Sequence, residues 1–503
     1  AFNRAVTQLD AVALAGLFAA DSHWRNISGL GWSFATVSGR AAVVPALIEA
    51  CQVCGGGNFA LAVDRHPPRL NKIAGEEVVE AVLRFQTAIG SGVGVVRFKP
   101  GSGSGGDLPV AWSLMTAVDR LDHEADEVPA DAEEAVHDRS TTGENWLDRR
   151  TAAQRYEERN PDVIVVGGGH AGITSAVELR QLGLDALIVD TMKRVGDNWR
   201  LRYHSLKLHN VTQVNHLPYM PFPQTFPRYI PKDKIANWLE SYVEHMDLNF
   251  WTETRFAGAT YDGATGRWRV RLERADGSAR EMHPKHIIMA TSVSGTPIIP
   301  EIPTLENFAG TVLHSSRFPG GEAWAGRKAL VFGTGTSGHD IAQELHANGA
   351  DVTIVQRSPT LIVNVDPSAQ LYDGSYFGLD EGKRLEDLDL FNTSVPIALI
   401  KENHKLITAK VRELDKDILD RLEKVGFRLE FGEDGTGWPL KYRTRGGGYY
   451  FNAGCSELIA DGKVGLIQYH DIERFTASGA LMKDGSEKAA DLIVLATGYK
   501  GPD

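Results

Sequence analysis

The sequence predicts an α/β protein with two doubly wound domains, preceded by a smaller α+β domain. Two short apolar runs, at residues 163–166 and 329–332, are each followed by a glycine-rich turn and a helical pattern. A buried parallel strand that leads into a helix in this way begins a β-α-β unit. The chain also has 503 residues, whereas roughly 100–200 residues are usual for one domain. We therefore expect several domains, two of them built alike.

The composition argues against several classes of protein. The formal net charge of −12 disfavours nucleic acid and anionic membranes as partners. No apolar run reaches the length of a membrane-spanning helix, and the N-terminus lacks the pattern of a signal peptide. The chain has 3 cysteines, which fits a reducing compartment, so we expect a cytoplasmic protein. The first residue is not methionine, and we expect the natural start to be processed or truncated.

Residues 1–125 differ in pattern from the rest of the chain. Helical patterns cover residues 10–20 and 43–50. Strand-like patterns cover residues 78–87 and 111–118. A mixture of short helices and strands without a glycine-rich turn predicts a small α+β domain.

Three segments mark the end of this domain. Residues 98–108 are rich in Gly and Ser and predict an exposed hairpin tip. Residues 122–138 are acidic and lack periodicity, which predicts a linker or an arm on the surface. Residues 144–156 predict a helix that docks the first domain onto the next. We therefore assign residues 126–160 to a linker and a docking helix.

The first glycine-rich turn, residues 167–172, fits the pattern G-x-G-x-x-G. Gly167 permits a tight turn, Gly169 allows a pyrophosphate to approach the backbone, and Gly172 lets the helix pack close to the strand. The N-terminus of the following helix presents free N–H groups to the anion. Asp190 ends the next strand, where a carboxylate binds a ribose. This Rossmann-like unit therefore predicts a dinucleotide site.

The second glycine-rich turn repeats the pattern with Gly333, Gly335 and Gly338. Here the next strand ends in Gln-Arg-Ser, with Arg357 in place of a carboxylate. An arginine can pair with a 2′-phosphate, which an acidic residue would repel. This favours NADPH at the second site, whereas the acidic end of the first site suits FAD.

Two such sites predict an FAD-binding domain at residues 161–324 and 451–503, and an NADPH-binding domain with an insertion at 325–450. The pair alone fits disulfide reductases, flavin oxidases and monooxygenases. A dithiol reductase would carry a cysteine pair among these motifs. No cysteine lies between residues 162 and 454, which argues against that class.

The connecting motifs narrow the choice. Residues 308–318 (FAGTVLHSSRF) resemble the fingerprint F-x-G-x-x-x-H-x-x-x-[Y/F] of the class B flavin monooxygenases, also called the flavin-containing monooxygenase family. Residues 196–199 (GDNW) and 496–499 (ATGY) resemble two further motifs of that family, and Ser292 replaces a glycine in a third. The residues carried by these motifs are Phe308, Gly310, His314 and Phe318 in the fingerprint, Trp199 near the flavin, and Thr497 and Gly498 at the cofactor.

Within that family, residues 203–209 (YHSLKLH) and 217–223 (LPYMPFP) look most like the plant YUCCA-type enzymes, which oxidatively decarboxylate an indole 2-oxo acid. Where many members have an active-site asparagine, this chain has His209, with Asn210 beside it. The resemblance therefore makes His209 and Asn210 the residues expected at the flavin–oxygen site, and gives His314 a structural role. The family also has further residues after the last motif, so we expect a longer natural chain.

The resemblance implies an NADPH-dependent monooxygenase that forms a C4a-(hydro)peroxyflavin with molecular oxygen. One oxygen atom would then pass to a small substrate: an amine, a sulfide, a ketone or a 2-oxo acid. Two alternatives stay open, an NADPH oxidase that releases hydrogen peroxide and a flavin-binding scaffold or sensor.

Residues 1–125 resemble the cone-shaped α+β domains of the nuclear-transport-factor-like and polyketide-cyclase-like (SnoaL-like) families. This resemblance rests on a helix, residues 21–25 (DSHWR), an aromatic strand and a glycine-initiated helix. In single-domain relatives Asp21 or His23 could be catalytic. In this chain, we expect the domain to cap the active site or to form a homodimer. We expect no metal site, because the pair Cys51 and Cys54 has no second ligand pair.

Overall fold

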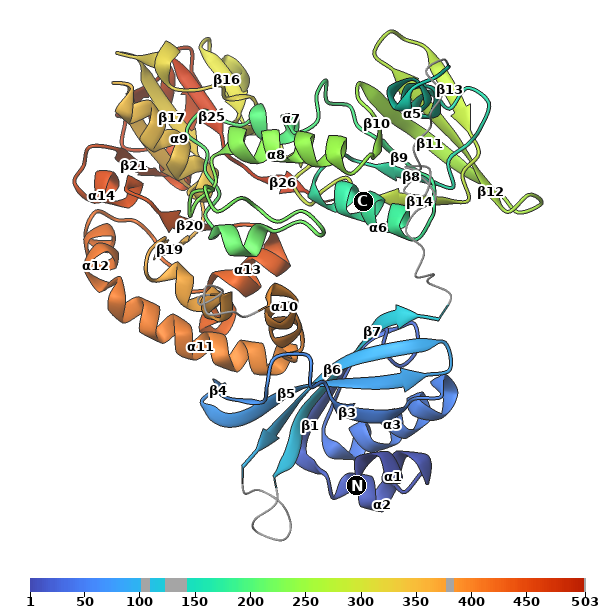
Figure 1. The fold of residues 1–503 in the computed structure, drawn as a ribbon. Helices are drawn as coiled ribbons and strands as arrows, with labels where there is room; N and C mark the ends of the chain where they lie inside the picture. The colour runs from blue at the N-terminus through green and yellow to red at the C-terminus, as the bar shows by residue number, and fades with distance from the viewer. Residues whose placement is uncertain (101–108, 123–142, 377–383, 502–503) are drawn as a thin grey trace. The chain divides into compact units, whose positions relative to one another are not determined.

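The computed structural model describes residues 1–100, 109–122, 143–376 and 384–501 (Figure 1). The chain divides into two compact units. Unit 1 comprises Ala1–Ala125, Asp366–Leu414 and Phe431–Leu440, and unit 2 comprises Asp126–Val365, Asp415–Glu430 and Lys441–Asp503. Most of the expected hairpin tip at 98–108 and of the acidic stretch at 122–138 lies outside the described residues.

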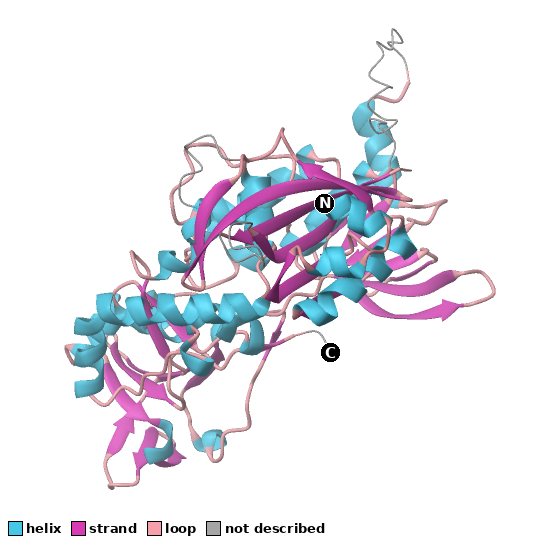
Figure 2. Ribbon diagram, turned by 90° about the horizontal axis from the view of Figure 1, so that it is seen from below, coloured by secondary structure: helices cyan, strands magenta, loops and turns pink. Residues whose placement is uncertain are grey.

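Unit 1 is built on one sheet with the strand order β2-β1-β7-β6-β5-β3, and β4 pairs with β5. Its first part contains α1 (Phe2–Thr7), α2 (Ala11–Ala15), β1 (Phe18–Ile27), β2 (Phe34–Ser38), α3 (Arg40–Cys54), β3 (Gly57–Leu61), β4 (Arg69–Ile73), β5 (Glu76–Thr87), β6 (Gly90–Lys99) and β7 (Val110–Leu121). Its later parts contain η5 (Ala369–Tyr376), α10 (Leu385–Thr393), α11 (Ile397–Leu414), η7 (Glu433–Gly435) and the start of α13 (Gly437–Arg445). The strands of this sheet are long and curved (Figure 2).

The helices α1, α2 and α3 pack on one face of this sheet. Leu14, Phe18, Trp24, Leu47 and Phe85 form the centre of that core, and each is 5% exposed or less. The helix expected at residues 10–20 is too long, because α2 ends at Ala15 and β1 begins at Phe18. An apolar run of this length does not distinguish a buried strand from a continuing helix.

The other face of the sheet is partly covered by α10 and α11. Phe391 of α10 packs among apolar side chains of β5, β6 and β7, namely Val82, Val93, Val95 and Met115. The Arg97 guanidinium donates to the carbonyl of Phe391 at 2.8 Å, and Asp387 pairs with Arg65 at 2.7 Å. The insertion that we expected within residues 325–450 therefore folds in large part with the N-terminal domain.

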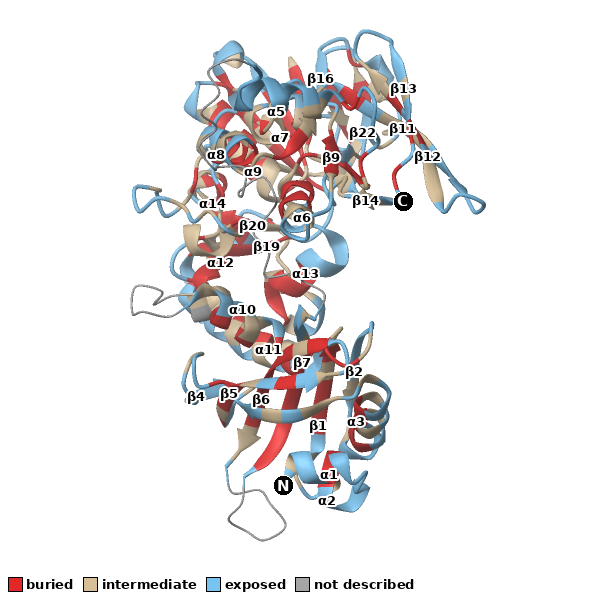
Figure 3. Ribbon diagram, turned by 45° about the vertical axis from the view of Figure 1, so that its right-hand side comes forward, coloured by how far each residue is buried: buried red, intermediate tan, exposed pale blue. Residues whose placement is uncertain are grey.

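A row of polar side chains crosses this second face of the sheet. Each member is the register partner of the next, in the order Ser38, His23, Ser113, Arg97, Glu80 and Arg69. Glu80 is fully buried and accepts from Arg97 at 2.9 Å and from Arg69 at 2.7 Å. Because a buried charge is costly unless it is paired, Glu80 and its two arginines stabilise one another. Figure 3 shows how much of β5, β6 and β7 is buried.

The first half of unit 2 contains a parallel sheet of order β10-β9-β8-β14. Helices α6 and α8 pack on one face, and the antiparallel sheet β11-β12-β13 packs on the other. The elements are α5 (Trp146–Arg155), β8 (Val163–Val166), α6 (His170–Gln181), β9 (Ala186–Val189), α7 (Asp197–Arg200), η1 (Thr212–Asn215), α8 (Lys232–His245), β10 (Asn249–Trp251), β11 (Thr254–Asp262), β12 (Arg267–Arg274), β13 (Ala279–Met282), β14 (His286–Met289) and β15 (Thr296–Pro297).

The second half repeats this plan with a parallel sheet of order β16-β25-β17-β18-β21. The antiparallel sheet β22-β23-β24 packs against it, and α9 contacts β17 and β18. The elements are η2 (Leu305–Asn307), β16 (Thr311–His314), η3 (Ser315–Arg317), η4 (Glu322–Trp324), β17 (Lys328–Phe332), α9 (Thr336–Ala347), β18 (Asp351–Gln356), β19 (Leu361–Asn364), α12 (Lys416–Lys424), β20 (Tyr449–Asn452), α14 (Cys455–Ala460), β21 (Gly465–Gln468), η8 (Tyr469–Asp471), β22 (Ile472–Thr476), β23 (Gly479–Met482), β24 (Glu487–Ala489), β25 (Leu492–Leu495) and β26 (Tyr499–Lys500).

This pairing corrects the boundary expected near the C-terminus. Residues 451–503 were assigned to the first sheet's domain, yet β21 and β25 both pair within the second sheet. Local sequence does not determine which distant strands pair in a parallel sheet, and the expected boundary was wrong for this reason. The chain turns back between the two sheets only after β25, where β26 pairs with β15.

The expected helix at residues 144–156 is α5. Asn145 and Asp148 form a capping box at its start, each side chain bonding to the other's backbone N–H. Arg150 of this helix donates to Asn249 and to the carbonyl of Leu248, so α5 packs on the first half of unit 2.

Candidate dinucleotide sites and the residues beside them

The first glycine-rich turn connects β8 to α6, and its outer glycines are required by close packing. Gly167 has φ +109, and a Cβ there would lie 2.3 Å from the carbonyl oxygen of Ala290. A Cβ at Gly172 would lie 1.8 Å from the carbonyl oxygen of Gly167. Any larger residue at either position would push the turn away from the strand.

The middle glycine leaves room for a ligand. Gly169 is the N-cap of α6 and supplies no side-chain cap, so the first N–H groups of the helix keep their donors free for an anion. A Cβ at Gly169 would meet only Asn198 within 4 Å, at 3.5 Å. The buried Oδ1 of Asn198 has no hydrogen-bond partner within the described ranges. The open N-terminus of α6 fits a bound pyrophosphate, and the unpaired Oδ1 of Asn198 fits a hydroxyl or N–H donor of the same ligand. The sequence motif alone does not indicate Asn198.

Asp190 lies at the end of β9, as the motif predicts. Its Oδ2 accepts from the N–H of Gly168 at 2.6 Å, and its Oδ1 accepts from the N–H of Met192 at 2.8 Å. The carboxylate is therefore held in a fixed orientation beside the glycine turn, where a ribose hydroxyl would donate to it.

The second turn connects β17 to α9 with the same geometry. Gly333 has φ +107, and a Cβ there would lie 2.3 Å from the carbonyl oxygen of Ala496. A Cβ at Gly338 would lie 1.9 Å from the carbonyl oxygen of Gly333. Gly335 is the N-cap of α9, again without a side-chain cap. Each turn thus packs under the first residue of an A-T-x motif and leaves a helix N-terminus available to a second pyrophosphate.

The end of β18 differs from the end of β9 in charge. Gln356 is fully buried and bonds to the backbone of Arg428, and the exposed Arg357 follows it. The Arg428 guanidinium donates to the carbonyl of Arg357 at 2.6 Å, while its buried Nε has no partner among residues that the structure describes. Arg428 is therefore a second cation at this position. It lies 71 residues after Arg357 in the sequence, so the motif around Arg357 does not indicate it.

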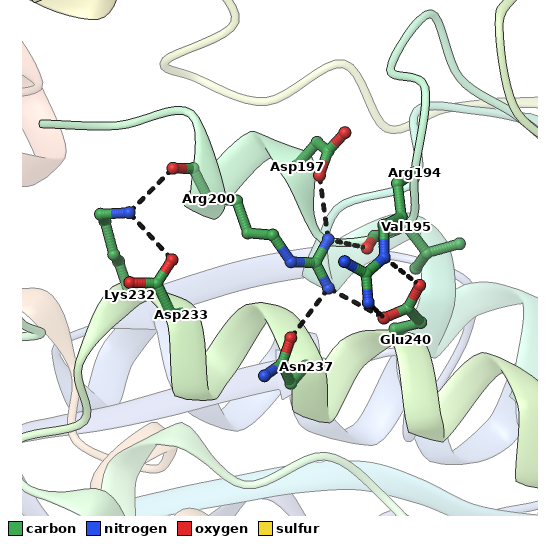
Figure 4. A network of polar contacts seen from close by, with 8 residues as sticks. All are labelled: Arg194, Val195, Asp197, Arg200, Lys232, Asp233, Asn237 and Glu240. Atoms are coloured by element: carbon green, nitrogen blue, oxygen red, sulfur yellow. Dashed lines mark hydrogen bonds and ion pairs between the residues drawn. The ribbon is translucent and has the colours of Figure 1, made fainter. Parts of the chain in front are cut away.

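A polar network links α7, the helix that contains Trp199, to α8 (Figure 4). Arg200 donates to Asp197, Asn237 and Glu240 and to the carbonyl of Val195, at 2.7–3.1 Å. Gly196 precedes α7 with φ +87, and a Cβ there would lie 2.4 Å from a carbonyl of α8. The Nε1 of Trp199 donates to Nε2 of His170 in the first turn at 3.2 Å, and burial lowers the pKa of His170.

The fingerprint residues anchor the chain between the two sheets. Phe308 and Phe318 are buried, and a Cβ at Gly310 would lie 2.4 Å from the ring of Phe308. His314 Nδ1 accepts from the N–H of Ser316, so Nε2 carries the proton that it donates to the carbonyl of Gly498 at 3.2 Å. Burial lowers the pKa of His314, which favours this neutral form.

Thr497 and Gly498 bind the same connection. The Thr497 hydroxyl donates to the carbonyl of Ile298 at 2.6 Å, and the N–H of Ile298 donates to the carbonyl of Gly498 at 2.9 Å. Both residues therefore hold the return strand β26, directly after the second sheet ends.

His209 lies against α9 rather than alone. Its Nε2 is 3.6 Å from Oδ2 of Asp340, and its ring lies beside that of Phe451 with centroids 5.6 Å apart. Asn210 is partly buried beside it. Asp340 follows the second glycine turn, and no local sequence pattern indicates that it lies near His209.

The polar candidates of unit 1 do not form one site. Asp21 accepts from Lys99 and from Trp112 at 3.0 Å, whereas His23 contacts Ser38 at 2.8 Å. Burial raises the pKa of Cys51 to about 12 and also raises that of Cys54, so neither thiol is activated. Across residues 1–100, 109–122, 143–376 and 384–501, no group of three or more potential metal ligands occurs. No helix within those ranges is long and apolar enough to cross a membrane.

The fold and the two turns fit a protein with two dinucleotide sites, one on each parallel sheet. Residues 160–371 match the model of the flavin-binding monooxygenase-like family. The chain is 28% identical over 364 residues to Indole-3-pyruvate monooxygenase YUCCA1 of Oryza sativa subsp. japonica, covering 70% of this chain and 80% of that protein. It is 29% identical over 343 residues to Probable indole-3-pyruvate monooxygenase YUCCA4 of Arabidopsis thaliana, covering 68% and 76%.

Solved structures agree on the fold. A cyclohexanone monooxygenase with bound epsilon-caprolactone superposes with a TM-score of 0.50 at 21% identity, covering 68% of this chain and 73% of that one. The open form of a cyclohexanone monooxygenase gives 0.50 at 22% identity, covering 67% and 73%. Over residues 160–371 the chain resembles the flavin-binding monooxygenase-like family. It is an FAD- and NADPH-dependent monooxygenase, and thus an oxidoreductase.

Proposed function

We propose that this monooxygenase uses FAD at the first glycine turn and NADPH at the second to oxidise a small 2-oxo acid. One observation carries the assignment of the two sites. The turns are alike in backbone, but Asp190 follows one and Arg357 with Arg428 follows the other. A carboxylate suits the unphosphorylated ribose of FAD, and two guanidinium groups suit the 2′-phosphate of NADPH.

Each residue at the first site has a proposed task. Gly167, Gly169 and Gly172 admit the FAD pyrophosphate to the N-terminus of α6, and Asp190 accepts from the ribose. Asn198 offers its unpaired Oδ1 to the same ligand. Trp199 and the neutral His170 line the approach to the flavin ring.

At the second site, Gly333, Gly335 and Gly338 admit the NADPH pyrophosphate to the N-terminus of α9. Arg357 pairs with the 2′-phosphate, and Arg428 supports it from the neighbouring segment. FAD, once reduced by NADPH, supplies the electrons that activate oxygen. The chain's own task is to bind both cofactors, to orient them and to keep water from the reacting atoms. His209 and Asn210 are the polar side chains that we place at that reaction site.

The names of two relatives support a 2-oxo acid as the substrate class. Both plant proteins are named for activity on indole-3-pyruvate, a 2-oxo acid, and this chain aligns with most of their length. Residues 203–209 and 217–223, which follow the flavin-side network of α7, also resemble the plant enzymes in sequence.

The N-terminal domain is proposed to have a nuclear-transport-factor-like fold, because three helices cover one face of its curved sheet. Its other face holds α10 and α11 of the insertion, so we propose that the domain supports this insertion rather than catalysing a reaction of its own.

The proposed substrate class can be tested with purified holoprotein, NADPH and a panel of aromatic and aliphatic 2-oxo acids, sulfides, amines and ketones. We expect a 2-oxo acid to give one carboxylic acid and one CO₂ per NADPH consumed. Turnover of a sulfide or ketone without any 2-oxo acid would refute this substrate class. Hydrogen peroxide equal to NADPH with every compound would instead indicate an oxidase.

A further inference from the structure

Asp340 of α9 has two partners from the flavin side of unit 2. The Tyr203 hydroxyl donates to its Oδ2 at 2.7 Å, across 137 residues of sequence. Nε2 of His209 lies 3.6 Å from the same oxygen, which is ion-pair distance but too long for a hydrogen bond. One carboxylate oxygen is therefore shared between a phenol and an imidazole.

Tyr203 fixes the orientation of this carboxylate. It is 1% exposed, and burial together with the nearby Asp340 raises its pKa well above the usual value. It therefore stays protonated and acts as a donor to Asp340. The oxygen that Tyr203 binds is the same Oδ2 that lies 3.6 Å from Nε2 of His209.

His209 has two unlike nitrogens in this setting. Nε2 is buried, faces Asp340 and has no hydrogen-bond partner in the described part of the chain. The side chain is still 20% exposed, with Phe451 beside its ring. Because a carboxylate only accepts, Nε2 must carry a proton for the contact with Asp340 to be favourable. The remaining nitrogen, Nδ1, is then an unprotonated acceptor.

We propose that Asp340 is a positioning residue that holds His209 with its proton on Nε2, so that Nδ1 exchanges protons at the reaction site. A carboxylate that orients a histidine in this way is a recurrent design for acid–base catalysis. The inference rests on the proposed function, because it takes His209 as the residue beside the flavin.

The proton balance of the reaction indicates what the pair of His209 and Asp340 would do. The net reaction is NADPH + H⁺ + O₂ + substrate → NADP⁺ + H₂O + oxygenated substrate, so each turnover takes up one proton from solvent. NADPH and the substrate each give two electrons, and oxygen takes four. The proton enters at Nδ1 of His209 and ends in the water, while the Nε2 proton stays with the Asp340 contact throughout.

Nuclear magnetic resonance of ¹⁵N-histidine-labelled holoprotein reads the tautomer directly, and His209→Gln identifies the signals. We expect the Nε2–H form in the native protein and a mixture of both forms in Asp340→Asn, which keeps an acceptor for Tyr203 but removes the charge. Glu344→Gln is a matched control, because Glu344 lies one turn further along α9 and binds Ser205 instead. A native Nδ1–H form, or an unchanged tautomer in Asp340→Asn, would overturn the proposal.

A kinetic split separates positioning from stability. In Asp340→Asn we expect flavin reduction by NADPH and NADP⁺ affinity to stay within about twofold, while oxygen transfer slows roughly 10- to 100-fold. Asp340→Glu should restore part of that rate. An equal loss in Asp340→Asn and Glu344→Gln would mean a structural role only. If the native protein oxidises no 2-oxo acid, the tautomer result still stands, so the two proposals fail separately.

Discussion

Nε2 of His314 donates to the carbonyl oxygen of Gly498 at 3.2 Å, although the two residues are 184 positions apart. His314 ends β16 and Gly498 follows β25, and these two strands are neighbours in the second sheet. The bond therefore closes the fingerprint segment onto the final motif of the chain. His314 therefore has a structural role in which Nε2 is the donor and Nδ1 is the acceptor.

His314→Phe should destabilise unit 2, because it removes the hydrogen bonds that the buried imidazole makes with Ser316 and Gly498. We expect a loss of about 1–3 kcal/mol, measured as a lower urea midpoint of the unfolding transition. The exposed His470, replaced in the same way, is the control. Equal midpoints for the two variants would contradict the structural role of His314.

His339 should make stability depend on pH. Burial lowers its pKa to about 4, and its ring stacks on Tyr450 with centroids 4.0 Å apart. An unfolded histidine binds a proton below about pH 6.5, but the folded one resists protonation, so its contribution is complete above pH 6.5 and is lost as pH falls toward 4. The slope from this group is at most about 1.4 kcal/mol per pH unit. Unfolding of His339→Gln across this range should lack that component, and an unchanged slope would refute it.

Gly333→Ala should weaken NADPH binding while FAD stays bound. The substitution places a Cβ 2.3 Å from the carbonyl of Ala496 at φ +107, which strains the turn. Strain of about 1–3 kcal/mol corresponds to a roughly 5- to 150-fold weaker affinity. Calorimetric titration with NADP⁺ measures this. The open position Gly263, changed to Ala, should have no effect. A normal NADP⁺ affinity in Gly333→Ala would place the cofactor elsewhere.

Arg357→Ala should raise the KM for NADPH roughly 10- to 100-fold, since it removes a charge-assisted bond to phosphate. The KM for NADH should change little, because NADH lacks the 2′-phosphate. Initial rates of flavin reduction with both nucleotides test this, with the exposed Arg474→Ala as control. A parallel loss with NADH would show that Arg357 does not read the phosphate.

Asp387→Ala should loosen the insertion from the N-terminal sheet. Asp387 is 1% exposed, pairs with Arg65 at 2.7 Å and accepts from the N–H of His66 at 3.0 Å. Removing one partner of a buried pair costs about 3–5 kcal/mol. Faster hydrogen exchange in α10 and β6 would report it, and the exposed neighbour Glu386→Ala is the control. Unchanged exchange in α10 would contradict the docking.

The parts of the fold that local chemistry dictates could be predicted from the sequence. Gly167 and Gly333 are needed because a carbonyl lies where a Cβ would be, and the strand, turn and helix around them have a recognisable period. The end of α2 could not be predicted in this way, because Leu17 and Phe18 continue an apolar run into a strand.

Contacts between distant segments could not be predicted from the sequence for a different reason. The pairing of Arg97 with Glu80 and Phe391, and of Asp340 with Tyr203, depends on how separate elements pack. No local sequence pattern around Asp340 indicates that its partner Tyr203 lies more than a hundred residues away in the chain. Similarly, the sequence of β25 is compatible with either parallel sheet, because buried strands in both sheets have the same continuous apolar pattern.

The most direct test of the whole account is stopped-flow absorbance of NADPH-reduced protein mixed with oxygen, with and without a 2-oxo acid. We predict that NADPH bleaches the flavin and that oxygen then produces a lasting absorbance distinct from both oxidised and reduced flavin. That absorbance should decay faster when the 2-oxo acid is present. Immediate return of oxidised flavin with one hydrogen peroxide per NADPH, whatever compound is added, would contradict a monooxygenase.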